Sequence, residues 1–163
     1  MSEFRIDLSP FCIRARSFIA QGRIEDALGL YGDVLQVDPI NAMAYADRGT
    51  AYAMLKKFEL ALSDLNKAFS LGYQDSSAYS TTATIFFELK DFQKALDYFS
   101  RAIKLDAGYP LAYYNRSNVF YEIGSFNAAI SDLEKCLEFN SGEDFKKLVI
   151  NRLSYIKGKL LSK

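Results

Sequence analysis

The side chains that most often carry catalysis are sparse in this chain of 163 residues. It has no histidine, so it lacks the usual general base near neutral pH and the imidazole ligand of metal sites. Its two cysteines, Cys12 and Cys136, stand far apart in the sequence, whereas structural zinc sites need closely spaced cysteine pairs. Ser-His and Cys-His nucleophile pairs are therefore excluded, and we expect no catalytic residue and no metal site.

Two pairs of adjacent acids, Glu25–Asp26 and Glu143–Asp144, are the remaining candidates for acid–base or metal chemistry. Each pair stands where a helix is expected to begin, and the helix dipole favours acids there without any chemistry. The run Gly29-Leu30-Tyr31-Gly32 lies inside an expected helix, and both nucleotide-binding glycine patterns are absent. We therefore expect a protein that is not an enzyme and holds no cofactor. An enzyme or enzyme subunit stays an alternative without supporting residues, which turnover by the purified protein would revive.

The composition excludes further classes of function. Twenty Lys and Arg balance twenty Asp and Glu, so the formal net charge is zero, which argues against a nucleic-acid partner. Hydrophobic residues make up 50% and aromatic residues 15%, too many for a disordered chain. No apolar run approaches the length of a membrane span, and the first residues lack the apolar core of a signal peptide. We expect a cytoplasmic protein that binds neither nucleic acid nor membrane.

An internal repeat organises the sequence. The alanines Ala27, Ala61, Ala95 and Ala129 recur every 34 residues without a gap. Three further columns keep the same period: an aromatic residue (Phe11, Tyr45, Tyr79, Tyr113), a small residue (Ala15, Gly49, Ala83, Ser117) and a second aromatic residue (Phe18, Tyr52, Phe86, Phe120). Within each repeat the apolar spacing predicts two helices and no strand. Two antiparallel helices pack closely only where a small residue stands at the contact, which is the role expected of Gly49 and Ala61.

This pattern resembles the tetratricopeptide repeat family, in which a unit of this length is a helix-turn-helix. The resemblance implies a single all-α domain over residues 1–163, a right-handed α-solenoid with repeats at about 8–41, 42–75, 76–109 and 110–143. Residues 143–161 form an expected C-terminal capping helix, whose apolar face includes Phe145, Leu148, Val149, Ile156, Leu160 and Leu161. Two columns depart from the family. The usual leucine is replaced by Arg14, Arg48, Thr82 and Arg116, and the proline that closes a unit is present only as Pro39.

The resemblance also implies where a partner binds, since the first helix of each unit lines a concave groove in that family. These positions fall outside the packing columns, so we expect them to be available for recognition of a protein or peptide. The groove residues carried over to this chain are Asp47, Thr50, Met54, Thr81, Thr84, Phe87, Glu88, Tyr114, Asn115, Asn118, Tyr121 and Glu122. The asparagine amides can donate and accept at once and so suit a peptide backbone, while Tyr114, Tyr121 and Phe87 offer rigid aromatic area.

Some relatives hold a carboxy-terminal Glu-Glu-Val-Asp tail in a clamp of lysines, asparagines and arginine. At the clamp positions the first three repeats have Cys12, Arg16, Asp47, Ser77 and Thr81, and the last three have Ala46, Thr50, Thr81, Leu111 and Asn115. Neither set can neutralise two carboxylates, and Asp47 would repel them. We expect the clamp to be absent, and a ligand that is apolar with neutral or basic flanks.

The sequence therefore favours a non-catalytic adaptor or scaffold that binds a protein or peptide in the groove of a tetratricopeptide solenoid. A small secretion chaperone, which holds an extended segment of an exported protein, is the alternative. Such chaperones tend to be acidic and dimeric, whereas this chain is neutral. A homodimer is possible, because the exposed aromatic residues could also support self-association.

Overall fold

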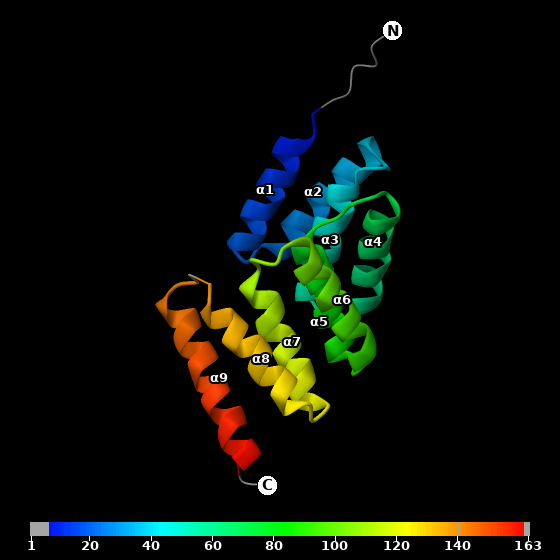
Figure 1. Cartoon of the computed structure of the whole chain (residues 1–163). Coiled ribbons are helices and arrows are strands. Elements are labelled where there is room, and N and C mark those ends of the chain that lie inside the picture. Colours follow the sequence, from blue (N-terminus) through cyan, green and yellow to red (C-terminus); the bar gives the residue numbers. More distant parts are fainter. Residues whose placement is uncertain (1–6, 140, 162–163) are drawn as a thin grey trace. The chain divides into compact units, whose positions relative to one another are not determined.

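The computed structural model describes residues 7–139 and 141–161, and this part of the chain contains nine α-helices and no strand. In chain order they are α1 (Ser9–Ala20), α2 (Ile24–Val37), α3 (Ala42–Met54), α4 (Phe58–Ser70), α5 (Ser76–Glu88), α6 (Phe92–Leu105), α7 (Pro110–Glu122), α8 (Phe126–Leu137) and α9 (Glu143–Leu161) (Figure 1). The expected all-α class and the helix pairs are confirmed.

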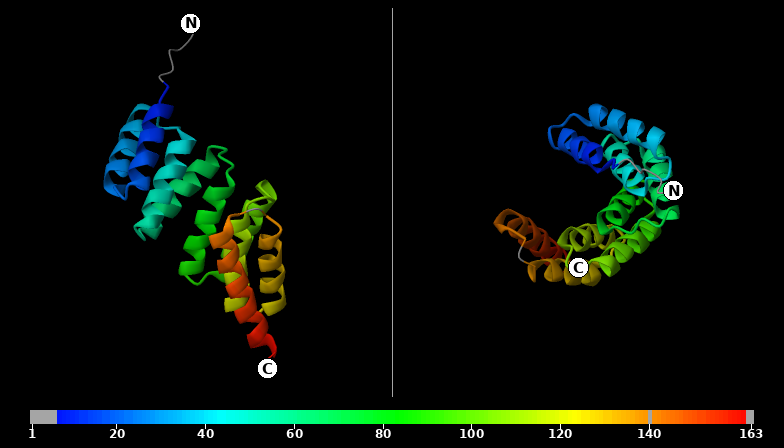
Figure 2. Two further views of the ribbon diagram at one scale, coloured as in Figure 1. Left: turned by 90° about the vertical axis from the view of Figure 1, so that its left-hand side faces the viewer. Right: turned by 90° about the horizontal axis from the view of Figure 1, so that it is seen from above.

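Contacts between helices divide the chain into two compact units, residues 1–74 and 75–163. In the first unit α1 packs on α2, α2 on α3 and α3 on α4. In the second, α5 packs on α6, α6 on α7, α7 on α8 and α8 on α9, and the last three helices lie side by side (Figure 2). Each unit therefore holds two of the sequence repeats, and the second unit adds the terminal helix.

One turn geometry joins the two helices of every repeat. Gly22, Lys56, Lys90 and Gly124 follow the repeat period, and all four have positive φ angles of 76°, 56°, 64° and 77°. The amide of each donates to a carbonyl in the last turn of the preceding helix, as in Gly124 N to Tyr121 O at 3.0 Å. The next amide donates to the carbonyl one residue further back, as in Ser125 N to Phe120 O at 2.8 Å. This left-handed helix end suits glycine, and two of the four turns form it with lysine.

The small-residue column lies where the two helices of a repeat touch. All four members are buried, and Gly49 shows why the column is small. A methyl group added there would lie 2.9 Å from Leu65 Cγ and 3.0 Å from the Ala61 carbonyl oxygen. The expected role of Gly49 and Ala61 at the contact between α3 and α4 is confirmed.

The second aromatic column is half-buried throughout, whereas the first varies between the ends of the chain. Tyr113 is 8% exposed because Phe139 packs against it, with ring centroids 5.8 Å apart. Phe11, in the same column of the first repeat, is 46% exposed. Val37 stands there at the position of Phe139 and is itself 59% exposed, so it does not cover the ring.

The arginines that replace the family's leucine have a structural role in two repeats. Arg48 forms a two-pronged ion pair with Asp64, Nε to Oδ2 at 2.7 Å and Nη2 to Oδ1 at 2.9 Å. Arg116 repeats this with Asp132 at 2.8 and 2.7 Å. Both aspartates are largely buried. The ion pairs tie the first helix of each repeat to the second, a role that the sequence reasoning did not foresee.

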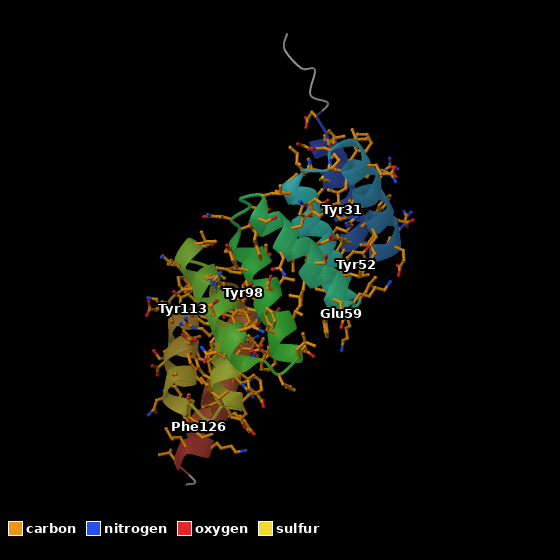
Figure 3. The ribbon with its side chains drawn as sticks, turned by 90° about the vertical axis from the view of Figure 1, so that its right-hand side faces the viewer. Tyr31, Tyr52, Glu59, Tyr98, Tyr113 and Phe126 are labelled. Carbon is orange, nitrogen blue, oxygen red and sulfur yellow. The ribbon has the colours of Figure 1, made fainter. Side chains whose placement is uncertain are left out.

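In the third repeat a tyrosine fills the same place. Tyr98 comes from α6 (Figure 3). Its ring lies against those of Phe86 and Tyr79 of α5, at centroid distances of 5.5 and 6.1 Å. These two rings belong to the same columns as Tyr113 and Phe120, between which the Arg116 guanidinium lies at 5.7 Å from each. An arginine from the first helix and a tyrosine from the second are therefore alternative fillings of one site.

The terminal helix α9 spans the residues expected for it and packs on the second unit through Val149 and Ile156, both fully buried. Phe145 and Leu153 pack against the same core. The expectation for Leu148, Leu160 and Leu161 was wrong, since they are 48%, 39% and 88% exposed. Only one side of α9 has neighbours among the described residues. Fewer of its apolar side chains are therefore buried than the sequence pattern predicted.

Candidate functional site

The predicted groove residues divide between the two units. Asp47, Thr50 and Met54 lie on α3 of the first unit. The second unit carries the others on α5 (Thr81, Thr84, Phe87, Glu88) and α7 (Tyr114, Asn115, Asn118, Tyr121, Glu122). Since α5 and α7 contact each other, the second unit brings these residues onto neighbouring helices.

Asp47 is not available as a bare negative charge. Arg16 of α1 donates two hydrogen bonds to its carboxylate, from Nε at 2.8 Å and Nη2 at 3.1 Å. The partnership raises the pKa of Arg16. Burial first, and the charge of Asp47 second, raise the pKa of the buried Tyr31. Because Arg16 neutralises its charge, Asp47 should repel an acidic ligand less than the sequence indicated.

The other predicted groove residues of the first unit, Thr50 and Met54, differ in exposure. Thr50 donates its hydroxyl to the Ala46 carbonyl at 2.9 Å, one turn back in its own helix, and Met54 is 53% exposed. Cys12 is completely buried and packs in the core with Ala15 and Tyr31. Of these residues, Met54 presents the most side chain to solvent.

On α5 two of the three predicted polar residues are exposed, whereas the aromatic residue Phe87 is half-buried. Thr84 and Glu88 are exposed, and Thr81 is half-buried. Thr84 donates its hydroxyl to the Ser80 carbonyl at 2.9 Å. Phe87 packs on Phe92 at the start of α6, with ring centroids 5.9 Å apart. One part of the Phe87 ring therefore packs in the core, and the rest is accessible to solvent.

Tyr114 and Tyr121 on α7 are not spare residues, because α9 packs against both. Tyr114 meets Phe145 edge to face, with centroids 5.7 Å apart. Tyr121 meets Tyr155 at 5.9 Å, and the two phenol oxygens are 3.2 Å apart. The expectation that these tyrosines fall outside the packing columns was wrong, since the terminal helix continues the packing of α7.

Asn115 and Asn118 remain available. Both are half-buried on α7, and neither side-chain amide has a hydrogen-bond partner among residues 7–139 and 141–161. Glu122, one turn beyond Asn118, is exposed. We define the α5/α7 face by the accessible polar residues Thr84, Glu88, Asn115, Asn118 and Glu122. This face offers two neutral amides on α7 and two carboxylates, one at the last residue of α5 and one at the last residue of α7.

The sequence reasoning missed the contribution of α9 to this side of the unit. Val149 and Ile156 are buried as Ala112 and Val119 are on α7, but they come three residues later than the repeat period would place them. This three-residue offset is the sequence feature that could have revealed the packing of α9 on α7. A strict alignment of the first four repeats does not show it.

In the shifted register, Arg152, Tyr155 and Lys159 take the positions that Asn115, Asn118 and Glu122 hold on α7. Contacts with α7 agree with this placement, since the Arg152 guanidinium carbon lies 4.4 Å from the centroid of the Tyr121 ring. The terminal helix therefore extends the α5/α7 face with basic and phenolic groups.

Among the described residues, no group of three or more Cys, Asp and Glu side chains is placed to hold a metal ion. None of the described helices combines the length and the apolar character needed to cross a membrane.

Known proteins share parts of this sequence. Human RNA polymerase II-associated protein 3 is 34% identical over 58 residues, which are 36% of this chain and 9% of that protein. Tetratricopeptide repeat protein 36 of Caenorhabditis elegans is 43% identical over 54 residues, which are 32% of this chain and 30% of that protein. The chain therefore spans only a small part of these curated relatives.

Solved structures share the fold over most of the chain. Pseudomonas aeruginosa pilF matches 94% of this chain and 70% of its own, with a TM-score of 0.81 at 19% identity. MamA matches 93% of this chain and 82% of its own, with a TM-score of 0.73 at 25% identity. The first TPR of Spaghetti, solved with the HSP90 peptide SRMEEVD, matches 72% of this chain and 93% of its own, with a TM-score of 0.66 at 25% identity.

Three family models match the chain itself. Two described as tetratricopeptide repeat match residues 14–76 and 111–142, and one described as TPR repeat matches residues 83–124. The matched residues lie in both compact units. The family's helix-turn-helix unit agrees with the helix pairs and with the turn geometry that they share. The chain belongs to the tetratricopeptide repeat family.

Proposed function

We propose that this protein is a non-catalytic adaptor that binds an extended peptide segment of a partner protein on the α5/α7 face. The observation that carries the proposal is the pair Asn115 and Asn118, whose half-buried amides lack partners among the described residues. An amide both donates and accepts, so two of them one turn apart suit the alternating N–H and C=O groups of an extended backbone. Solvent reaches both amides, because neither is among the buried unpartnered atoms, so a peptide backbone can replace the water bound there.

The solved relatives support this class of function. The first TPR of Spaghetti has an HSP90 peptide bound in its structure, at 25% identity to this chain. The ligand itself should differ, because the clamp positions of this chain hold Thr81 and Leu111 rather than basic residues. A peptide of other chemistry is therefore proposed.

The charges of the face indicate which peptide. Glu88 on α5 and Glu122 on α7 are exposed, and neither forms an ion pair with a described residue. We infer a ligand with apolar residues and a basic residue opposite Glu88 or Glu122, since charge complementarity favours opposite signs across an interface.

The test is selection of ligands from a phage-displayed library of random peptides, followed by calorimetry on one enriched peptide. Asn115→Ala and Asn118→Ala should each raise its Kd about tenfold, the loss of one buried hydrogen bond of about 1.4 kcal/mol. Asn127→Ala is the matched control, because Asn127 is exposed on α8. No enriched peptide, or an enriched peptide that binds Asn115→Ala and Asn118→Ala as well as wild type, would overturn the proposal.

A further inference from the structure

Among the described arginines, Arg152 alone combines partial burial with the lack of an acidic partner. Five of them pair with aspartates (Arg16 with Asp47, Arg23 with Asp26, Arg48 with Asp64, Arg101 with Asp97, Arg116 with Asp132). Arg152 forms no ion pair or hydrogen bond with any described residue, and its Nε atom is buried without a partner. Arg14 also lacks an acid among these residues but is exposed, so solvent satisfies it. Arg152 is half-buried.

Two tyrosines hold the Arg152 guanidinium in place. Its carbon lies 4.4 Å from the Tyr121 ring centroid and 5.7 Å from that of Tyr155, within the range of cation–π attraction. The two phenol oxygens are 3.2 Å apart, which fixes the rings relative to each other. A guanidinium oriented in this way loses little conformational freedom when it binds a ligand.

The terminal Nη groups of Arg152 reach the surface, because only Nε is both buried and unpartnered. Lys159 adds a second positive charge, with Nζ 5.8 Å from the Tyr155 ring centroid. Hydrogen bonding to Tyr121 raises the pKa of Lys159, so this ammonium is charged at neutral pH. The cluster is thus a set of donors with two positive charges at the edge of the α5/α7 face.

We propose that Arg152 and Lys159, positioned by Tyr121 and Tyr155, bind a carboxylate of the peptide ligand. This inference rests on the proposed peptide-binding function and adds a subsite to it. The planar guanidinium fork matches a carboxylate, and such charge-assisted bonds are about twice as strong as neutral ones. The carboxylate comes from an Asp or Glu side chain or from the end of the peptide. A ligand that binds both the α5/α7 face and this cluster then carries a basic residue near Glu122 and the carboxylate near Arg152.

Acetate is a probe that tests the subsite without knowing the peptide. The measurement is the ¹⁵Nε–Hε NMR resonance of Arg152, assigned by its loss in Arg152→Lys and recorded during titration with sodium acetate against sodium chloride at equal ionic strength. We expect a saturable shift with acetate alone, with the Kd raised at least threefold in Lys159→Gln. Lys157→Gln is the control, because Lys157 pairs with Glu134 at 2.8 Å on another side of α9, and it should leave the Kd unchanged.

An absent shift, an equal response to chloride, or an equal Kd in Lys159→Gln overturns the subsite. Titration with inorganic phosphate forms a separate arm, and tighter binding of phosphate than of acetate also overturns the carboxylate assignment. Saturation by acetate with no peptide enriched would leave the carboxylate subsite standing and reject peptide binding.

Peptides identify the source of the carboxylate. Three versions of the enriched peptide are compared: one glutamate with an amidated end, glutamine with a free carboxylate end, and glutamine with an amidated end. One of the first two should bind about tenfold more tightly than the third, and Arg152→Lys should remove that advantage. If all three bind equally, and Asn115→Ala weakens each, the peptide site stands and the carboxylate subsite is rejected.

Discussion

Arg116 grips both carboxylate oxygens of Asp132, with Nη2 2.7 Å from Oδ1 and Nε 2.8 Å from Oδ2. Nη1 of the same arginine donates to the Ser100 hydroxyl of α6 at 3.1 Å. The Arg116 side chain therefore links α7 to α8 within its own repeat and to α6 of the preceding repeat. Arg48 and Asp64 form the same pair in the second repeat. The ion pair replaces an apolar contact that the family makes at this position.

Removal of one partner from this ion pair should be costly. Asp132→Ala leaves the Arg116 charge largely buried and unpaired, so we expect the free energy of unfolding in urea to fall by about 2–4 kcal/mol. The double variant Arg116→Thr/Asp132→Tyr copies Thr82 and Tyr98 of the third repeat and should recover part of that loss. Asp97→Ala, which breaks an exposed pair, should cost no more than about 0.5 kcal/mol. Equal losses for Asp132→Ala and Asp97→Ala would contradict this account.

Two glycines in helices should respond to alanine with opposite signs. A methyl group at Gly49 meets Leu65 Cγ at 2.9 Å, whereas nothing lies within 4 Å of one at Gly29 in α2. Gly49→Ala should lower the free energy of unfolding by about 1–3 kcal/mol through overpacking. Gly29→Ala should raise it by about 0.5–1 kcal/mol through helix propensity. Chemical denaturation of the two variants checks both signs, and stabilisation by Gly49→Ala would contradict the packing.

The terminal helix offers a matched pair of isoleucines. Ile156 is fully buried and Ile150 is 49% exposed. Ile156→Ala should cost about 2–5 kcal/mol in the unfolding of the second unit, and Ile150→Ala should cost less than about 1 kcal/mol. Loss of Ile156 should also loosen Tyr121, because α9 holds that ring through Tyr155. Thermal and urea unfolding followed by circular dichroism measure both changes, and equal effects would show that α9 packs differently.

Cys136 should make stability depend on alkaline pH. Burial, and then the charge of Asp132, raise the pKa of its thiol to about 12, and the thiol donates to the Pro110 carbonyl at 3.3 Å. Between the ordinary thiol pKa of 9.0 and this value, the unfolded state loses the proton while the folded state keeps it. The stabilisation is therefore complete below pH 9 and is lost as the pH rises, with a slope on the order of 1 kcal/mol per pH unit.

The measurement is urea unfolding of wild type and Cys136→Ala at pH 8 and at pH 10.5. Other groups also titrate in this range, so the difference between the two proteins isolates the thiol. Wild type should lose more stability than the variant on going to the higher pH. Parallel losses in both proteins would show that the Cys136 thiol ionises normally.

Much of the fold could be predicted because the repeat period is strict. The small residue at Gly49, the buried Ala61 and the extent of α9 all follow from spacing, since each repeat must place the same contacts at the same positions. The ion pair of Arg48 and Asp64 could not be foreseen from one repeat. Its members stand sixteen residues apart, and apolar periodicity gives no information about which charges meet.

The candidate site was harder to predict than the fold. Tyr114 and Tyr121 are covered because α9 packs in a register shifted by three residues, and that shift lies outside the repeat pattern. The pairing of Asp47 with Arg16 depends on the side chains of two repeats together. Position along one helix shows which side a residue is on, but neighbouring helices decide whether it is available to a ligand.

The central claim is that a peptide binds the α5/α7 face, and site-specific crosslinking tests it most directly. Both native cysteines are buried, so a benzophenone maleimide will label one introduced at the surface. Thr84→Cys places the probe on the α5/α7 face, and Ser131→Cys places it on α8, both at exposed positions. The account predicts that the enriched peptide crosslinks on irradiation to the label at position 84 and not to that at position 131. Crosslinking at position 131 alone would contradict the account.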